Sequence, residues 1–536
     1  MRRKFKAILL NIGSPLYGES SAPPLASGCL MSWALADPDV RSSSSVSFLP
    51  AGANEGARSL AARVARLRPA LVGFTCYVWN IRESLEAASR LKELLPESLI
   101  VFGGPEAAGC GRELLVSQPA IDMIAGGEGE ETFRLLLKNL AAGGSFGGVP
   151  GLLYRERSGV VSTPDPELID LSKLPSPFLL GHIEVPHNPK VLYLESSRGC
   201  PFTCSFCEWG PRQMRHVPLE RLREEVAFAV AAGAKNIKYV DADILMDRKR
   251  ALPLLQTFLD LSADSPAVLH IETNPVHLWP EIVDLISEQP KKFYLSFGLQ
   301  SISPEVMRKI NRPFNFAKIE ERLGYLNERC PQVRCNYSVI FGLPGETLEG
   351  FCMSLEWALR RHPTRLHSHH CLILPGSDLL RQASSLKIEF QKTAPHQVLE
   401  TPSMPRSDME AARELAFWIY IVSEFPLIRD YLFTVAKELP EERWRYLGVI
   451  RRWARFVESR GMDLGCGCPI GAIGRFTPCD LAYRAKTKLL ADPLALASLD
   501  RITKSFVETE SPGRLERTRK ILSTLEKRWE CLIVGE

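Results

Sequence analysis

The chain has 536 residues, of which 45% are hydrophobic and 24% are charged, and its 66 basic and 62 acidic residues leave a net charge of +4. This length exceeds a single hydrophobic core and predicts two or three domains. The near-neutral charge gives no reason to expect nucleic acid or an anionic membrane as the main partner. No apolar run approaches the roughly 20 residues that cross a bilayer.

The start of the chain, MRRKFKAILLNIGSPLYG, has a basic head followed by a short apolar stretch. Its apolar core, at residues 7–10 and 12, is shorter than the roughly 7–15 residues of a signal-peptide core. We therefore expect a first β-strand here and a cytoplasmic protein. The 14 cysteines lack the regular spacing of a disulfide framework, which predicts reduced thiols, a few of them metal ligands.

Residues 1–150 alternate short apolar runs with amphipathic segments, which predicts an α/β domain of the Rossmann-like type. Strands are expected at 6–12, 45–49, 70–75, 99–102 and 121–124. Helices are expected at 57–67, 81–95 and 130–140. Glycines and polar turns follow the expected strands, at the edge where such sheets bind ligands.

The proline-rich segment 151–189 is expected to be a linker. Alternation resumes over 190–385 and predicts a partial (βα)6 barrel of the TIM type, with its site at the carboxyl ends of the strands. Strands are expected at 191–196, 236–240, 267–272, 293–299, 334–341 and 366–374. Helices are expected at 219–232, 248–261, 280–287, 316–329 and 347–361. Residues 386–536 are expected to be mainly helical, with helices at 407–425, 441–460 and 512–527.

Three cysteines follow the first expected barrel strand in the stretch SSRGCPFTCSFCEWG. Cys200, Cys204 and Cys207 have the spacing C-x3-C-x2-C. A structural zinc site uses four ligands, and a cubane iron–sulfur cluster normally uses four thiolates. Three thiolates would leave one iron open to an outside ligand. The residues alone leave open two other readings, which are three buried thiols or a zinc site completed by one of His182, His187 and His216.

The segment RGCPFTCSFC resembles the signature of radical S-adenosylmethionine (radical SAM) enzymes. The resemblance implies a [4Fe-4S] cluster on the three cysteines, S-adenosylmethionine on its open iron, and cleavage to a 5′-deoxyadenosyl radical. FGLQSISPEVMRKINRPFN, VIFGLPGET and HCLILPGSDL resemble the fourth, fifth and sixth strand segments of that family. The residues that the resemblance places near the cofactor are Phe206, Asp241, Asp243, Glu272, Asn274, Gln300, Ser301, Arg312 and Gly342. Arg198 and Arg312 are candidates to pair with the cofactor carboxylate.

An α/β domain directly before such a barrel resembles the cobalamin-binding subgroup of this family. GFTCYVWN, VFGGPEA and GGEGEETF look like loops of that subgroup. The dinucleotide fingerprint G-x-G-x-x-G is absent after the first strand, and so is the D-x-H-x-x-G motif that supplies a histidine to cobalt. Cobalamin would then lack a histidine ligand from this domain. The expected corrin neighbours are Ser14, Thr75, Tyr77, Trp79, Gly103, Gly104, Glu128 and Gly129. The alternative is a domain that packs on the barrel without a cofactor.

The resemblance implies a C-methyltransferase that moves a methyl group from S-adenosylmethionine through methylcobalamin to an unactivated carbon. A radical cyclisation, ring contraction or other rearrangement without net methyl transfer is the alternative within the subgroup. A non-catalytic metal-binding protein is the alternative from another class. The expected partners are a small-molecule or peptide substrate and an electron donor such as flavodoxin or ferredoxin.

Two further groups of metal-ligating residues occur outside these motifs. Cys466, Cys468 and Cys479 could hold an auxiliary cluster, although a glycine- and proline-rich loop with incidental thiols is the preferred reading. His367, His369 and His370 lie along the sixth expected strand, with His367 and His370 on opposite faces. The remaining barrel cysteines are expected to be small buried hydrophobes. They are Cys330, Cys335, Cys352 and Cys371.

Overall fold

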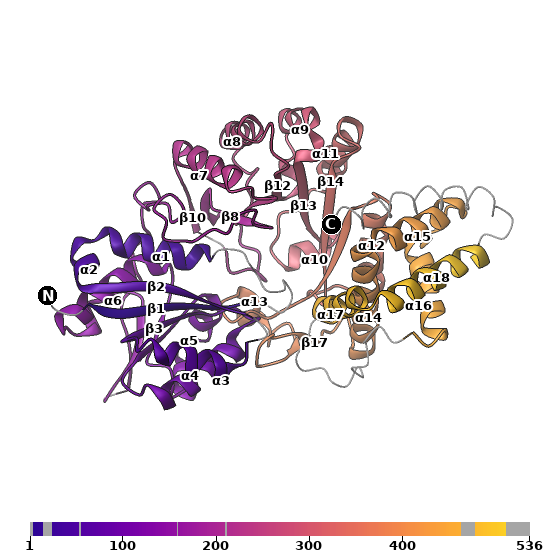
Figure 1. Cartoon of the computed structure of the whole chain (residues 1–536). Coiled ribbons are helices and arrows are strands. Elements are labelled where there is room, and N and C mark those ends of the chain that lie inside the picture. The colour runs from indigo at the N-terminus through magenta and orange to yellow at the C-terminus, as the bar shows by residue number, and fades with distance from the viewer. Residues whose placement is uncertain are drawn as a thin grey trace.

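The computed structural model describes residues 4–13, 24–52, 55–157, 159–209, 212–462 and 478–510. Figure 1 shows three parts that follow one another along the chain: an α/β domain in indigo and purple, a second α/β domain in magenta and pink, and a group of helices in orange and yellow. Within the described residues, no helix combines the length and the apolar character that a membrane crossing requires.

The first domain is built on a seven-stranded sheet with the order β2-β1-β3-β4-β5-β6-β7. The first five strands are parallel, and β6 and β7 join antiparallel at one edge. The strands are β1 (Phe5–Ile12), β2 (Ser44–Ala51), β3 (Leu71–Thr75), β4 (Leu99–Gly103), β5 (Met123–Ala125), β6 (Leu152–Glu156) and β7 (Gly159–Ser162). The helices are α1 (Leu25–Ala36), α2 (Pro38–Ser43), α3 (Ala57–Arg66), α4 (Ile81–Leu94), α5 (Pro105–Ser117) and α6 (Gly129–Ala142).

Helices cover both faces of this sheet because β1 is apolar on both sides. Ile8 belongs to the buried cluster that includes Leu60 of α3, whereas its neighbour Leu9 belongs to a separate cluster with Phe133 of α6. Successive strand residues point to opposite faces, so one continuous apolar strand supplies two cores. The expectation of a parallel sheet with a helical layer on each face is confirmed.

The first domain also contains elements that periodicity did not indicate. The segment expected to be a linker supplies β6 and β7 to the sheet. The unexpected helix α1 has the sequence LASGCLMSWALA, whose residues are apolar or small all round, so no helical stripe stands out. In α5 the backbone is interrupted at Gly111, and glycines weaken its helical pattern.

The second domain contains a six-stranded parallel sheet with the order β15-β14-β13-β12-β11-β8, which confirms the partial barrel. Its strands are β8 (Leu192–Leu194), β11 (Asn236–Tyr239), β12 (Val268–Thr273), β13 (Phe293–Gln300), β14 (Arg334–Phe341) and β15 (Arg365–His370). Its helices are α7 (Leu219–Ala231), α8 (Arg248–Leu261), α9 (Pro280–Glu288), α10 (Pro304–Lys309), α11 (Phe316–Arg329) and α12 (Leu348–Leu359). Between β8 and α7 lies an unexpected antiparallel pair, β9 (Ser197–Cys200) and β10 (Arg212–His216).

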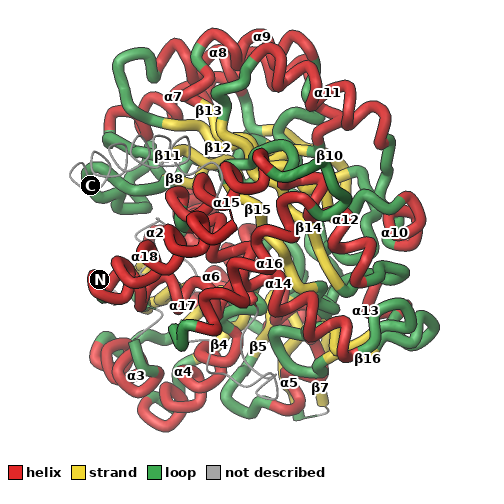
Figure 2. The backbone as a smooth tube through the Cα atoms, turned by 90° about the vertical axis from the view of Figure 1, so that its right-hand side faces the viewer, coloured by secondary structure: helices red, strands yellow, loops and turns green. Residues whose placement is uncertain are grey.

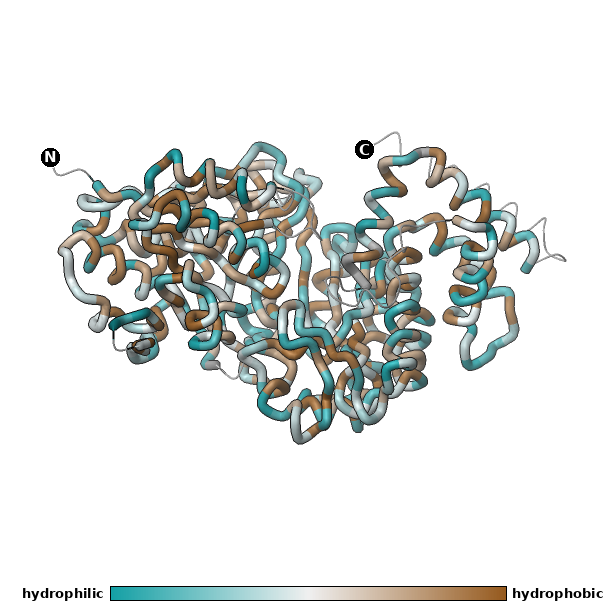
Figure 3. Tube along the Cα trace, turned by 90° about the horizontal axis from the view of Figure 1, so that it is seen from below, coloured by the Kyte–Doolittle hydropathy of each residue, from teal (hydrophilic) through white to brown (hydrophobic). Residues whose placement is uncertain are grey.

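The helical region packs directly on the barrel. Trp418 and Trp453 belong to the same buried cluster as Leu269 of β12, and Figure 2 shows the helices gathered beside β14 and β15. In Figure 3 hydrophobic and hydrophilic residues alternate closely along all three parts, as amphipathic elements require. The elements are α13 (Asp378–Gln382), β16 (Glu389–Phe390), β17 (Val398–Glu400), α14 (Arg406–Glu424), α15 (Pro426–Glu438), α16 (Arg445–Ser459), α17 (Pro478–Ala491) and α18 (Pro493–Glu510). The helix expected at 512–527 lies outside the described residues.

Candidate functional site

The three cysteines share one loop after the first barrel strand, here called the cysteine loop (residues 200–207). Cys200 ends β9, and Cys204 and Cys207 follow on the turn that leads toward β10. Cys204 is buried, and the other two are partly buried. The N–H of Cys207 donates to the carbonyl of Cys204 (3.0 Å), so the turn closes on itself. Phe206 packs against the barrel core.

Hydrogen bonds from neighbouring elements hold the cysteine loop in place. The Ser205 N–H donates to the carbonyl of Ile310 after α10 (2.9 Å), and the Ser205 carbonyl accepts from the N–H of Leu379 in α13 (2.7 Å). The Asn311 amide donates to the carbonyl of Thr203 (3.1 Å). These contacts fix the positions of the cysteines through the fold itself, which pre-organises the loop for a metal group.

Arg312 brings a positive charge to the cysteine loop. Its Nη1 lies 3.8 Å from Cys204 Sγ, and its Nη2 donates to the carbonyl of Gly298 (2.7 Å). Burial raises the pKa of the Cys200 and Cys207 thiols, and the Arg312 charge opposes that rise. Because metal binding requires thiolates, a guanidinium fixed at this point favours the state that binds a metal.

The spacing of the sulfurs argues against a single zinc ion. Among the described residues, three metal-ligating atoms all lie within 4.8 Å of one another only at Glu106, Cys110 and His396, so at least one pair of sulfurs in the cysteine loop is more than 4.8 Å apart. Tetrahedral zinc with bonds of about 2.3 Å would hold its sulfurs roughly 3.8 Å apart. His182 instead hydrogen-bonds to Ser32 of α1 (2.9 Å). The wider triangle fits a multi-iron cluster.

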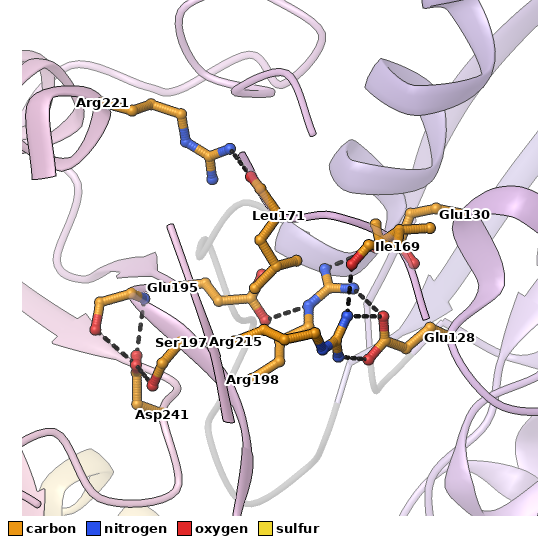
Figure 4. A network of polar contacts seen from close by, with 11 residues as sticks. Glu128, Glu130, Ile169, Leu171, Glu195, Ser197, Arg198, Arg215, Arg221 and Asp241 are labelled. Carbon is orange, nitrogen blue, oxygen red and sulfur yellow. Dashed lines mark hydrogen bonds and ion pairs between the residues drawn. The ribbon is translucent and has the colours of Figure 1, made fainter. Parts of the chain in front are cut away.

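Asp241 follows β11 and fixes the turn from which the cysteine loop starts. Its carboxylate accepts from the N–H of Ser196 (2.9 Å) and from the hydroxyls of Ser196 (2.7 Å) and Ser197, and Figure 4 shows these contacts. Burial raises the pKa of this carboxyl group, and the hydrogen bonds oppose the rise. Asp241 therefore fixes the residues directly before the cysteine loop.

Asp243 ties the end of β11 to the end of β12. It accepts from the N–H of Asn274 (2.9 Å), the hydroxyl of Thr273 (2.7 Å) and Nδ1 of His277 (2.8 Å). Both carboxylates of the segment YVDADILMD are thus bonded within the protein, and their contact with the amino group of S-adenosylmethionine stays a prediction.

Polar side chains of β11, β12 and β15 approach one another in the barrel. Lys238 Nζ lies 2.6 Å from the carboxylate of Glu272, and Glu272 is exposed. His367 and His369 lie two residues apart on β15, with ring centroids 5.8 Å apart. His369 is exposed, yet desolvation lowers its pKa and the Glu272 charge opposes the change. The Glu272 charge acts on His369, so the carboxyl-end side chains of β12 and β15 lie near one another. His370, on the opposite face of β15 from His367, is buried.

The fourth and fifth strands end in a buried polar contact. The Ser301 hydroxyl donates to the carboxylate of Glu346 (2.6 Å), and burial raises the pKa of Glu346 to about 7. Gln300, directly before Ser301, has a φ of 67°. Gly342 has a φ of 80°, and a Cβ there would lie 3.0 Å from the Met409 side chain of α14. The VIFGLPGET segment therefore supports the junction between barrel and helical region, and the adenine contact of Gly342 stays a prediction.

The carboxyl edge of the first sheet carries seven of the residues expected beside a corrin. They are Thr75, Tyr77, Trp79, Gly103, Gly104, Glu128 and Gly129. The Tyr77 and Trp79 rings stack with centroids 4.3 Å apart, and Trp79 is 42% exposed. A Cβ on Gly103 would meet no atom closer than 3.9 Å, whereas one on Gly104 would collide with a backbone carbonyl of the loop after β3. An exposed tryptophan stacked on a partly buried tyrosine, beside an open glycine edge, fits a large planar ligand.

A buried ion network joins the two domains where the carboxyl edges of their sheets meet (Figure 4). Arg198 on β9 contacts Glu130 at 2.7 Å, Glu195 at 2.8 Å and Glu128 at 3.2 Å. Arg215 on β10 also contacts Glu128. We call these five residues the junction network. Arg198 and Glu128, candidates for cofactor contacts, are instead bonded to each other across the domain boundary.

Ser14, Cys466 and Cys468 lie outside the described residues. Cys479 falls in α17, but its side chain is not among those described. Their expected roles stay predictions.

Sequence reasoning missed several residues of this region. Glu346 stood within a quoted motif, and a carboxylate that follows two glycines at a strand end is a usable signal. Asn80 donates to the carbonyls of Ile12 (3.1 Å) and Thr75 (3.0 Å) and so ties β1 to β3. The bond from Asn80 to Ile12 and the ion pairs between Arg198, Arg215, Glu128 and Glu130 have no sequence signal, because these partners are distant in the chain.

Two family comparisons agree with this geometry. Residues 194–358 match the model of the radical SAM superfamily, and residues 40–137 match the B12 binding domain. The chain therefore carries a B12 binding domain and a radical SAM domain in series, as its resemblance to cobalamin-binding radical SAM enzymes implied. The expected family and fold class are confirmed.

Individual relatives point the same way. The chain is 29% identical over 348 residues to the 2-(S-pantetheinyl)-carbapenam-3-carboxylate methyltransferase of Streptantibioticus cattleyicolor, covering 61% of this chain and 50% of the relative. It is 26% identical to the cobalamin-dependent radical SAM methyltransferase TokK of Streptomyces tokunonensis, covering 64% and 53%. The chain thus spans about half the length of these curated relatives.

Solved structures share the fold at low sequence identity. The radical S-adenosylmethionine methyltransferase TsrM from Kitasatospora setae superposes with a TM-score of 0.60 at 18% identity, covering 76% of this chain and 82% of that one. The cobalamin-dependent S-adenosylmethionine radical enzyme OxsB superposes with a TM-score of 0.61 at 14% identity, covering 99% and 80%.

Proposed function

We propose that this protein is a cobalamin-dependent radical SAM C-methyltransferase. The observation that carries the proposal is the arrangement of the two domains: the cysteine loop and the glycine-rich edge of the first sheet both lie where the two domains meet. When bound, the [4Fe-4S] cluster, S-adenosylmethionine and cobalamin would supply the radical and the methyl group. Two relatives with methyltransferase names support net methyl transfer over a rearrangement.

The residues of the chain would bind, orient and shield these groups. Cys200, Cys204 and Cys207 would hold the cluster, and Arg312 would balance its negative charge or that of a cofactor carboxylate. Asp241 would keep the cysteine loop in register with the barrel. The remaining strand-end residues expected beside S-adenosylmethionine and the corrin would form the walls of the shared site.

The flat Tyr77 and Trp79 surface would cover one face of the corrin. The absence of any histidine before His182 in the sequence means that the first domain offers no imidazole to cobalt. A weakly held lower face suits methyl transfer.

The barrel cavity is the proposed substrate site. Lys238, Glu272, His367 and His369 present one cation, one carboxylate and two imidazoles to the cavity, which suits a polar small molecule or peptide. Replacing His369 with alanine should leave the iron content and the substrate-free cleavage of S-adenosylmethionine unchanged. Product formation should fall at least tenfold, which is on the order of the loss of one hydrogen bond to the substrate.

An external electron donor such as flavodoxin or ferredoxin would reduce the cluster, because the described residues include no domain of the chain that is known to supply electrons. Ten cysteines with described side chains are free thiols, which supports a reducing, cytoplasmic location. We propose no nucleic-acid partner, because the chain is nearly neutral.

The test is anaerobic reconstitution of the full chain with iron, sulfide and cobalamin. We expect about four irons per chain, and release of 5′-deoxyadenosine after addition of dithionite and S-adenosylmethionine. Cys204→Ala should lose both properties, whereas Cys330→Ala, which removes a buried thiol elsewhere in the barrel, should keep them. Product mass then separates the alternatives, because methylation adds one CH2 unit and a rearrangement does not. Bound zinc without iron would contradict the proposal.

A further inference from the structure

Three side chains of different metal-ligating types meet at the domain boundary, apart from the cysteine loop. Glu106 and Cys110 lie one turn apart at the start of α5, and His396 follows β16. The Glu106 carboxylate lies 2.9 Å from Nε2 of His396 and 3.8 Å from Sγ of Cys110, and the three ligand atoms all lie within 4.8 Å of one another. Two domains thus contribute to one compact set of nitrogen, oxygen and sulfur atoms.

The group is buried and oriented from behind. Glu106 is 4% exposed and His396 is 6% exposed. Nδ1 of His396 lies 3.3 Å from the carbonyl of Gln391, the partner that a metal-binding imidazole usually has on its other nitrogen. Nε2 lies at hydrogen-bond distance from the Glu106 carboxylate, and a metal ion bound here would take the place of the proton between these two atoms. His396 also has a φ of 59°, a left-handed conformation that persists only where its surroundings enforce it.

The charge around Cys110 is negative. The carboxylates of Glu106, Glu113 and Glu208 surround this thiol. On the far side of the loop that carries His396, Arg82 is bonded to the carbonyl of Ala394. Carboxylates in excess around a thiol and an imidazole attract a divalent cation and so favour its binding.

We propose that Glu106, Cys110 and His396 bind one zinc ion that joins the B12 binding domain to the C-terminal part of the chain, at the loop between β16 and β17. Zinc accepts this mixture of donors, with bonds of about 2.0–2.2 Å to oxygen and nitrogen and about 2.3 Å to sulfur. Tetrahedral geometry then separates the ligand atoms by roughly 3.3–3.6 Å. The separations of 2.9 and 3.8 Å already lie near these values. Cys110 gives up its proton on binding, and a water molecule takes the fourth position.

This site is independent of the proposed catalytic function, and the test keeps the two apart. The full chain with Cys200, Cys204 and Cys207 all replaced by alanine is supplied with one equivalent of zinc and desalted, and zinc is measured by mass spectrometry. We expect about one zinc per chain, consistent with a high-affinity structural site. Adding Cys110→Ser or His396→Gln should reduce zinc at least tenfold, whereas adding Cys335→Ser, a partly buried thiol of β14, should not.

X-ray absorption at the zinc edge reports the ligands directly. One sulfur at about 2.3 Å with nitrogen and oxygen neighbours supports the site, and it does not depend on whether a variant folds. Two results would overturn the proposal: a desalted protein that holds no zinc, or zinc whose content is unchanged by Cys110→Ser and His396→Gln. Zinc that disappears when the cysteine loop is removed would also refute it.

Discussion

Replacing Arg198 with methionine should loosen the domain boundary more than any exposed arginine change. Arg198 contacts three carboxylates at 2.7–3.2 Å, and its side chain is 13% exposed. Without it, Glu128 keeps its contact with Arg215, whereas Glu130 and Glu195 lose their ion pair with Arg198. Breaking a buried ion pair by removing one partner costs about 3–5 kcal/mol. The three contacts do not add, because each abandoned carboxylate can take up a proton at about 1.4 kcal/mol per pKa unit, and burial already raises the pKa of Glu195.

Differential scanning calorimetry measures the effect. At roughly 2–4 °C per kcal/mol for a domain of 150–250 residues, the transition of the first domain should fall by about 6–20 °C. Hydrogen exchange should accelerate at β5, α6 and β9, which carry or adjoin the network.

The matched control is Arg90→Met. Arg90 forms an exposed pair with Glu93 at 3.3 Å, and such a pair contributes about 1 kcal/mol or less. If the midpoints of Arg198→Met and Arg90→Met differ by less than about 2 °C, the junction network does not stabilise the boundary, and the reasoning from burial fails.

Two further variants test the packing of buried groups. The pKa of Glu346 is raised from 4.5 to about 7, so its contribution to stability is present at low pH and is lost as pH rises through 7. In thermal scans from pH 5 to 8, the stability of Glu346→Gln should rise relative to the wild type by on the order of 3 kcal/mol at pH 8. Glu349→Gln, a change at an exposed neighbouring residue, should follow the wild-type profile. Gly109→Ala should lower the stability by about 1–3 kcal/mol, because its Cβ would lie 2.7 Å from Pro375 across the domain boundary. Gly324→Ala, in an open position of α11, should raise it by about 0.5–1 kcal/mol, and equal effects at both glycines would contradict the close approach.

Local pattern was enough to predict most of the barrel. The strand at Arg334–Phe341 and the helix at Phe316–Arg329 agree with expectation to the residue, because period-two and period-3.6 patterns depend only on neighbours in the chain. Elements without such a pattern were missed. α1 is apolar or small all round, and β6 and β7 are short antiparallel strands in a segment expected to be a linker, with β7 at the edge of the sheet.

The sequence by itself determined the two domain types and the three-cysteine loop, since spacing, strand order and motif order are local properties of the chain. Tertiary structure decided what the charged residues contact. Arg198 pairs with Glu128, which lies 70 positions away, and His396 meets Glu106 from 290 positions away. Ion pairs and metal ligands are selected by distance in space and by the exclusion of water, and neither quantity is written in the spacing of residues along the chain.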